Sequence, residues 1–133
     1  MAKIRSRPLP KTILNAAEPQ LFVADLAASL AYYTQKLCFS VAFSYGDPPF
    51  YAQVERDAAK LNLRVVHGPA LNAELREREQ MLSASITLDH ADVLFREYQA
   101  RGVDFAQPLR DEPWGARTFI VRDPDGNLIL FAS

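Results

Sequence analysis

Residues 114–131 read WGARTFIVRDPDGNLILF, a pattern that predicts a β-hairpin. Two apolar-rich segments flank the turn Asp123-Pro124-Asp125-Gly126-Asn127. Pro124 presets φ, Gly126 can adopt a positive φ, and Asp and Asn side chains bond their own backbone and tolerate left-handed conformations. We therefore expect a strand on each side of this turn.

The elements before the hairpin follow one order twice. In the first half, a strand at 19–23 is followed by an amphipathic helix at 26–37 with Asp25 as its N-cap. Strands are expected at 40–45, 50–56 and 60–66. In the second half, a strand at 83–88 is followed by a helix at 93–101, with Asp92 as its N-cap and Gly102 as its stop signal. A strand at 103–106 and a loop at 108–114 precede the hairpin, and each half therefore reads βαβββ.

Weak internal similarity supports this repeat. Val23-Ala24-Asp25-Leu26 matches His90-Ala91-Asp92-Val93, and the residues around Arg56 match those around Asp123. We expect one domain over residues 1–133: an N-terminal arm at 1–15, a first module at 16–68, a connector at 69–81 and a second module at 82–133. A short solvated helix is expected at 72–80, within the connector.

Composition excludes several classes of protein. The chain has 133 residues, 49% hydrophobic and 23% charged, as in soluble globular domains. A net charge of −1 leaves no basic footprint for nucleic acid and no attraction to a membrane surface. The single Cys38 excludes an internal disulfide framework, and no apolar run approaches the roughly 20 residues of a spanning helix. The basic N-terminus lacks the apolar core of a secretory signal, so we expect a cytoplasmic protein.

The final hairpin and the helix-opening segment from Val23 to Ser29 resemble the vicinal oxygen chelate superfamily. This superfamily includes glyoxalase I, extradiol dioxygenases and bleomycin-resistance proteins, and the resemblance covers about residues 16–133. It implies an α+β fold in which two βαβββ modules form a curved mixed sheet with a cup-shaped cavity, and the helices cover the outer face.

Alternation along the strands separates a helix-covered face from a cup face. Leu21 and Val23, Leu61 and Leu63, and Ile86 and Leu88 form one aliphatic face that must pack under the helices. The opposite face is polar or mixed, so it faces solvent or a ligand. The final strand is apolar on both faces.

Metal-dependent members of the superfamily use four inward positions filled by His, Glu or Gln. The resemblance places Glu18, Asn62, Ser85 and Leu130 at these positions, and Leu130 stands where relatives carry a metal-binding Glu. Only Glu18 is a good ligand for a divalent ion. His67 and His90 are interpreted as surface or packing residues. We therefore expect no metal and no cofactor. Glu18 is left with three roles: a lone general base, a partner of Arg64 or Arg117, or a contact to a cationic ligand.

Fourteen aromatic residues are a large share of the chain, and most are expected in the core, including Phe43 and Phe131. The others either stack on a planar ligand or pack against loops or a second subunit. This second group is Phe22, Tyr45, Phe50, Tyr51, Trp114 and Phe119.

The Trp-Gly-x-Arg-x-Phe segment and the incomplete metal set resemble bleomycin-resistance proteins in particular. These relatives bind an antibiotic without turning it over, as dimers with ligand grooves at the subunit interface and an exchanged N-terminal arm. Pro8 and Pro10 would suit such an arm. Drug-sequestering relatives are acidic, whereas this chain is nearly neutral, which favours a planar, less cationic ligand over bleomycin.

The leading hypothesis is thus a metal-independent, homodimeric binding protein for an antibiotic-like molecule or planar metabolite, rather than an enzyme. The expected stacking residues are Phe22, Tyr51, Trp114 and Phe119, and the expected polar contacts come from Glu18, Gln53, Asn62 and Arg64, with Leu130 as an apolar wall. One alternative is a lyase, isomerase or dioxygenase that uses a divalent metal or Glu18 as base. Another is a structural or regulatory dimer with an unused cup.

Overall fold

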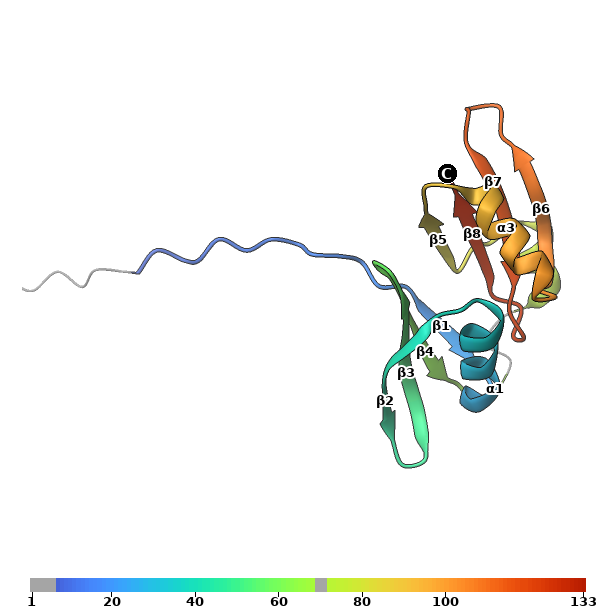
Figure 1. The fold of residues 1–133 in the computed structure, drawn as a ribbon. Helices are drawn as coiled ribbons and strands as arrows, with labels where there is room; N and C mark the ends of the chain where they lie inside the picture. Colours follow the sequence, from blue (N-terminus) through green and yellow to red (C-terminus); the bar gives the residue numbers. More distant parts are fainter. Residues whose placement is uncertain (1–6, 69–71) are drawn as a thin grey trace, which may run out of the picture.

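The computed structural model describes residues 7–68 and 72–133, and Figure 1 shows two halves with the same order of elements. The first half contains β1 (Gln20–Val23), α1 (Leu26–Ala31), the π-helix η1 (Tyr32–Lys36), β2 (Ser40–Gly46), β3 (Pro49–Arg56) and β4 (Ala59–Val65). The connecting helix α2 spans Ala73–Arg78. The second half contains β5 (Ala84–Thr87), α3 (Ala91–Ala100), β6 (Phe105–Asp111), β7 (Arg117–Arg122) and β8 (Leu128–Ala132). The predicted α+β class and the repeated βαβββ order are confirmed.

Each half forms its own four-stranded mixed sheet. The strand order is β1-β4-β3-β2 in the first sheet and β5-β8-β7-β6 in the second. In both sheets the first and last strands of the half pair in parallel, and the remaining neighbours are antiparallel. The aliphatic face of each sheet packs against its helix, and buried side chains from both halves form one continuous hydrophobic core.

The first helix begins as its sequence predicts. The Asp25 side chain accepts a hydrogen bond from the backbone N–H of Ala28 at 3.1 Å, which satisfies one of the free amides of the first turn. The prediction for the second helix was wrong at its start. α3 begins at Ala91 with His90 as its N-cap residue, and Asp92 lies in the first turn. Ala91, whose side chain is fully buried, is the first helical residue, and Asp92 in the first turn offsets the positive end of the helix dipole.

The sixth strand is longer than predicted. β6 continues through Pro108 to Asp111, where the sequence had indicated a loop. Pro108 is tolerated because β6 is an edge strand and its ladder with β7 is interrupted between Gln107 and Arg110. The remaining loop, which carries Trp114, is correspondingly short.

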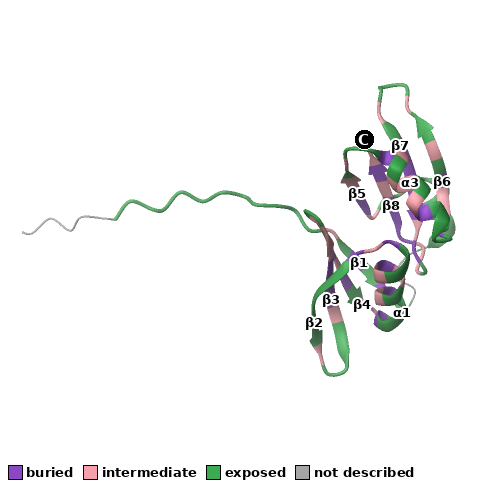
Figure 2. Ribbon diagram, in the orientation of Figure 1, coloured by how far each residue is buried: buried purple, intermediate pink, exposed green. Residues whose placement is uncertain are grey.

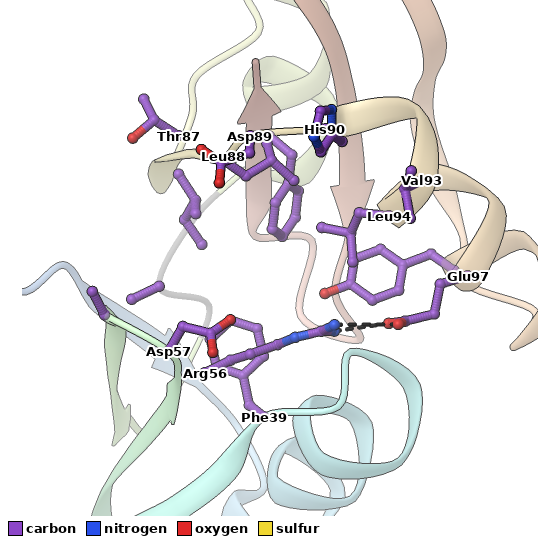
Figure 3. Close-up of a pocket in the computed structure, with 15 residues that line it drawn as sticks. Phe39, Arg56, Asp57, Thr87, Leu88, Asp89, His90, Val93, Leu94 and Glu97 are labelled. Carbon is purple, nitrogen blue, oxygen red and sulfur yellow. Dashed lines mark hydrogen bonds and ion pairs between the residues drawn. The ribbon is translucent and has the colours of Figure 1, made fainter.

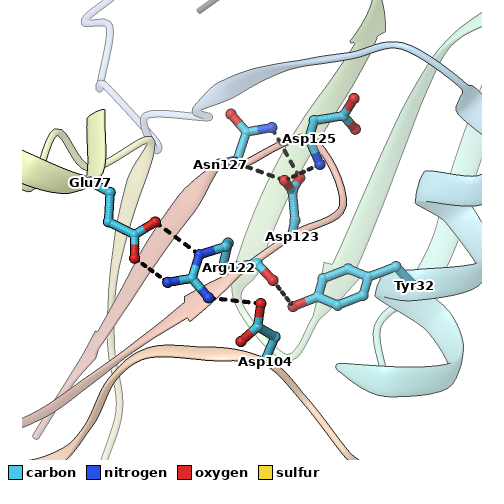
Figure 4. Close-up of polar contacts among 7 residues, drawn as sticks. All are labelled: Tyr32, Glu77, Asp104, Arg122, Asp123, Asp125 and Asn127. Atoms are coloured by element: carbon cyan, nitrogen blue, oxygen red, sulfur yellow. Dashed lines mark hydrogen bonds and ion pairs between the residues drawn. The ribbon is translucent and has the colours of Figure 1, made fainter. Parts of the chain in front are cut away.

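The predicted Asp-Pro-Asp-Gly-Asn turn joins β7 to β8 and folds around the Asp123 carboxylate (Figure 4). Oδ1 of Asp123 accepts hydrogen bonds from the backbone amides of Asp125 (2.9 Å) and Asn127 (2.8 Å). Oδ2 accepts from the hydroxyl of the buried Tyr33 at 2.8 Å. Burial raises the pKa of Asp123, although the hydrogen bonds from Asn127 and Tyr33 act in the opposite direction.

The same turn connects the second half to the first. The Asn127 side-chain amide donates to the carbonyl oxygen of Phe22 at 3.0 Å, and Asp125 accepts from the backbone N–H of Ala24 at 2.9 Å. Tyr32 donates to the carbonyl oxygen of Arg122, whose guanidinium is held by Glu77 and Asp104 (Figure 4). The turn thus closes one side of the junction between the two halves.

Residues 7–18, which include the described part of the arm (7–15), are all exposed to solvent, and Figure 2 shows the arm leaving the body of the protein before β1. Its apolar side chains Leu9, Ile13 and Leu14 are at least 80% exposed. Within residues 7–68 and 72–133, no helix is long and apolar enough to cross a membrane.

Candidate ligand-binding face

Three polar residues form a hydrogen-bonded strip on the face of the first sheet that points away from the helices. The buried Gln53 on β3 lies opposite Asn62 on β4, and its amide nitrogen donates to Asn62 Oδ1 at 2.9 Å and to Glu18 Oε1 at 2.7 Å. Both amide hydrogens of Gln53 are therefore in use. Glu18, Gln53 and Asn62, which the sequence assigned to one ligand site, are brought together. Gln20, which alternation along the strand also placed on this face but which was not among the expected ligand contacts, lies beside Asn62 in the β1–β4 register.

Aromatic side chains surround this strip on the same face. Phe43 lies opposite Gln53 across the β2–β3 ladder and stacks on Tyr51, with 6.1 Å between the ring centroids. Tyr45 lies opposite Tyr51, and Phe22 lies opposite Arg64 across the β1–β4 ladder. The predicted residues Phe22, Tyr51 and Arg64 thus share one face. We define the ligand face as these residues together with the polar strip: Glu18, Gln20, Phe22, Phe43, Tyr45, Tyr51, Gln53, Asn62 and Arg64.

The prediction that Phe43 belongs to the core was wrong, because its side chain is 46% exposed. β2 is an edge strand with register shifts on both sides of this region, so all its side chains before Gly46 remain accessible. The alternation of Phe43 and Tyr45, set against Tyr51 and Gln53 on the next strand, was the available signal.

Arg64 and Glu18 give the ligand face one charge of each sign. The Arg64 guanidinium carbon lies 5.4 Å from the centre of the Phe50 ring, a cation–π geometry. The Glu18 carboxylate is instead bound by Gln53. The expected pairing of Glu18 with Arg64 or Arg117 is not seen among the described contacts, because its partner is the neutral amide of Gln53 and Arg117 pairs with Asp111.

The second sheet presents a less polar face. Ser85, Leu130, Ile120 and Gln107 lie in register across its four strands. Gln107 donates to Thr118 Oγ1 at 3.0 Å, and Thr118 donates to Glu112 at 2.9 Å. Hydrogen bonds from Arg110 and Thr118 lower the pKa of Glu112. Leu130 is half-buried in the middle of this face, and Trp114 projects from the β6–β7 turn with 74% of its surface exposed. Both belong to the second half, whereas the polar strip belongs to the first.

The assignment of Phe119 to the ligand site was wrong. Its side chain is fully buried and stacks on Phe131 with 5.0 Å between ring centroids, beneath Phe95 and Tyr98 of α3. In the β7–β8 register Phe119 lies opposite Phe131 on the helix-covered face, and Thr118 and Ile120 take the other face. A ring enclosed in this way cannot stack on a ligand.

The donor set does not fit a catalytic metal. Glu18 is the one charged donor among the four mapped positions, Asn62 and Ser85 are weak donors, and the Leu130 side chain has no lone pair. Glu18 Oε1 and Asn62 Oδ1 both accept hydrogen bonds from the Gln53 side-chain amide. Within the described ranges, no three His, Cys, Asp or Glu residues lie close enough to share an ion. His67 and His90 are exposed and lie outside the strip.

Several solved structures have a fold similar to that of this chain. The bleomycin-binding protein from bleomycin-producing Streptomyces verticillus, solved with copper(II)-bleomycin, is 25% identical with a TM-score of 0.70, covering 91% of this chain and 97% of that one. TioX from Micromonospora sp. ML1 is 20% identical with a TM-score of 0.71, covering 89% and 97%. The bleomycin resistance determinant encoded on the transposon Tn5 is 19% identical with a TM-score of 0.68, covering 90% and 98%.

No curated protein sequence matches the chain. The family model, in contrast, matches residues 13–131, which is nearly the whole chain. The chain therefore belongs to the Glyoxalase/Bleomycin resistance protein/Dioxygenase superfamily.

Proposed function

We propose that this protein binds a planar small molecule without a metal and without turning it over, in the manner of bleomycin-resistance proteins. One observation carries the proposal: the ligand face leaves Phe22, Phe43 and Tyr45 between 39% and 68% exposed around a hydrogen-bonded polar strip. Exposed rings that are already ordered by their neighbours offer stacking area at little cost in conformational entropy. The strip supplies oriented polar atoms that would fix the position of the ligand.

The charge of the face narrows the class of ligand. Glu18 and Arg64 cancel, so the face has no net charge to attract a strongly cationic antibiotic. We therefore expect a neutral or weakly charged polycyclic ligand to bind more tightly than bleomycin, which the Streptomyces neighbour binds.

We infer further that the binding unit is a homodimer. In one chain the ligand face is open, while Leu130 and Trp114, the other expected ligand contacts, belong to the second sheet. A second copy that lays its second sheet over the first sheet of its partner would complete a groove at the subunit interface. The fully exposed apolar residues Leu9, Ile13 and Leu14 support exchange of the N-terminal arm in such a dimer.

A ligand screen by thermal shift tests this function, with doxorubicin as a planar probe and copper(II)-bleomycin as the reference. We expect a saturable rise in Tm with doxorubicin and a smaller rise with copper(II)-bleomycin. Tyr51→Ala, which removes a ring that stacks on Phe43, should weaken binding roughly fivefold, because a lost aromatic stacking contact typically costs about 1 kcal/mol. Met81→Ala, which truncates an exposed apolar residue outside the ligand face, is the matched control and should leave binding unchanged.

Metal content separates binding from the enzymatic alternative. Elemental analysis of untagged protein purified without chelators should find far less than one ion per chain, also after incubation with Zn²⁺, Ni²⁺, Mn²⁺ and Fe²⁺. About one tightly held ion per chain would contradict the proposal and would favour glyoxalase-type or dioxygenase chemistry. Size-exclusion chromatography with light scattering tests the dimer independently, and a monomer at micromolar concentration would contradict it.

A further inference from the structure

A cavity of about 460 Å³ lies between the two halves, on the helix-covered side of the sheets and thus opposite the ligand face (Figure 3). The first half contributes Phe39 and the turn from Arg56 to Ala59. The second half contributes the segment from Ile86 to His90, four residues of α3 and Phe131, and the α3 residues are Val93, Leu94, Glu97 and Tyr98. In Figure 3, Arg56 and Asp57 lie on one side of the opening, and Leu88, Asp89 and His90 lie on the other.

The cavity arises where the internal repeat is broken. Gln53 on β3 lies opposite Asn62 on β4, and in the second half Ile120 on β7 lies opposite Leu130 on β8. The turn that joins β3 to β4 is therefore the counterpart of the turn that joins β7 to β8. The turn after β7 spans Asp123 to Asn127 and reaches the first half, whereas only Asp57 and Ala58 separate β3 from β4. The space that the longer turn fills on one side of the junction therefore stays open on the other.

The floor of the cavity is apolar and well ordered. Phe39, Tyr98 and Phe131 are at most 5% exposed, and Ile86, Leu88 and Leu94 are half-buried beside them. Aliphatic and aromatic walls of this kind bind the apolar body of a ligand, and the volume lies within the range of small-molecule sites. The floor also includes no unsatisfied polar group among the described residues, since the Tyr98 hydroxyl donates to the carbonyl oxygen of Leu37 at 2.9 Å.

The rim carries an excess of negative charge. Its one guanidinium, Arg56, is bound by Glu97 through two contacts of 2.7 and 3.2 Å and by the Leu37 carbonyl oxygen at 3.0 Å. That pair is neutral as a unit. Asp57 and Asp89 form no side-chain hydrogen bond or ion pair with any described residue. The positive end of α3 is offset by its own Asp92, so two carboxylates remain to face a ligand.

We propose that this cavity is a second binding site, which takes an organic cation with an apolar body, such as an arylalkylamine. The ring would lie against the half-buried side chains of Ile86, Leu88 and Leu94, and the ammonium group would lie between Asp57 and Asp89. The site shares no residue with the ligand face, so a result that contradicts this second site would leave the proposed function unaffected.

Titration of the full-length chain with tryptamine tests the site, followed by backbone-amide NMR. Indole-3-propionate, which has the same ring with the opposite charge, is the matched probe. We expect saturable binding of one tryptamine per chain, with shifts confined to the turn after β3 and to the segment from Ile86 to Leu94, and at least tenfold weaker binding of the anion. Phe43→Ala on the ligand face should leave tryptamine binding unchanged.

The double variant Asp57→Asn/Asp89→Asn should weaken tryptamine binding about tenfold, because exposed charge pairs add modest energies that fall with salt. Glu74→Gln/Glu79→Gln removes the same charge on and next to α2, outside the cavity, and should change binding less than twofold. Equal affinity for the two probes, or shifts on the ligand face, would overturn the proposal. So would binding that appears only after removal of residues 1–15, since the arm would then be the natural occupant of the cavity.

Discussion

The turns after β3 and β7 hold equivalent places in the two halves, yet only the second closes the junction between them. Asp123 occupies the position that Arg56 has in the first half, at the end of the central strand. Asp123 collects hydrogen bonds from its own turn and from Tyr33 of the other half, whereas Arg56 binds Glu97 across an open cavity. The difference shows that a few extra turn residues with the right side chains can replace a cavity with a structural contact.

Asp123→Ala should be the most damaging change to the closed side of the junction. It leaves the buried Tyr33 hydroxyl and two backbone amides without their acceptor, so we expect the free energy of unfolding to fall by about 3 kcal/mol. Asp57→Ala in the short turn is the matched variant and should change it by less than about 0.5 kcal/mol. Urea denaturation measures both, and equal losses would mean that the two turns contribute alike.

Tyr33 and Tyr98, each the eighth residue counted from the start of its helical segment at Leu26 or Ala91, sharpen the comparison. The Tyr33 hydroxyl donates to a buried carboxylate, whereas the Tyr98 hydroxyl donates to a neutral backbone carbonyl oxygen. Because hydrogen bonds to charged groups contribute more, Tyr33→Phe should lower the free energy of unfolding by about 2 kcal/mol and Tyr98→Phe by about 1 kcal/mol. The Tyr33 hydrogen bond also lowers the pKa of Asp123, so Tyr33→Phe should raise that pKa further above its usual value. A ¹³C-detected titration of the Asp123 carboxyl group checks this direction, and an unchanged pKa would argue against the contact.

Gly126 tests whether the long turn depends on its backbone. The backbone φ of Gly126 is +81°, a value that residues other than glycine rarely adopt. A methyl group added at this position would contact only Ala73, at 3.5 Å. Gly126→Ala should therefore cost about 1 kcal/mol through backbone strain alone. Gly115→Ala, with a φ of +98° and open space around it, is the control with a similar expected cost. A much larger loss at Gly126 would show that the strain disturbs the junction as well.

The ion pair on the open side predicts a small pH dependence. The hydrogen bond from Arg56 lowers the pKa of Glu97 below its usual value of 4.5. The contribution of the Arg56–Glu97 ion pair to the free energy of unfolding is fully present above pH 4.5 and is lost as the pH falls through the lowered pKa of Glu97. Because both side chains are about one-third exposed, we expect this ion pair to contribute about 0.5 kcal/mol to the free energy of unfolding. Thermal unfolding of Glu97→Gln between pH 3 and 6 should lack this decline, and a slope identical to that of the unmodified chain would contradict it.

The sequence was sufficient where a local signal has one physical solution. The Asp25 cap, the glycine-containing final turn and the order of strands all follow from short-range rules and are found in the structure. The place of Asn62 could also be predicted, because a polar residue on a strand with one aliphatic face has only the other face available, and Glu18 and Gln53 join it there.

Face assignment failed where both faces of a strand are apolar. Phe119, Ile120 and Val121 give no alternation of polarity, so only the register with β8 places Phe119 in the core. Phe43 was misplaced for the opposite reason, since an edge strand with register shifts leaves apolar side chains exposed. The cavity at the junction could not be predicted at all, because it depends on the distance between two halves that no local pattern specifies.

The hydrogen bond from Asn127 to the Phe22 carbonyl oxygen has a consequence for how the protein melts. The ring of Phe22 lies on the ligand face, while its backbone is held by a turn of the other half. A ligand that restrains Phe22 would therefore also protect β8 from opening. We expect the two halves to unfold in a single cooperative transition, and amide hydrogen exchange should slow in Leu128–Ala132 when the ligand face is occupied.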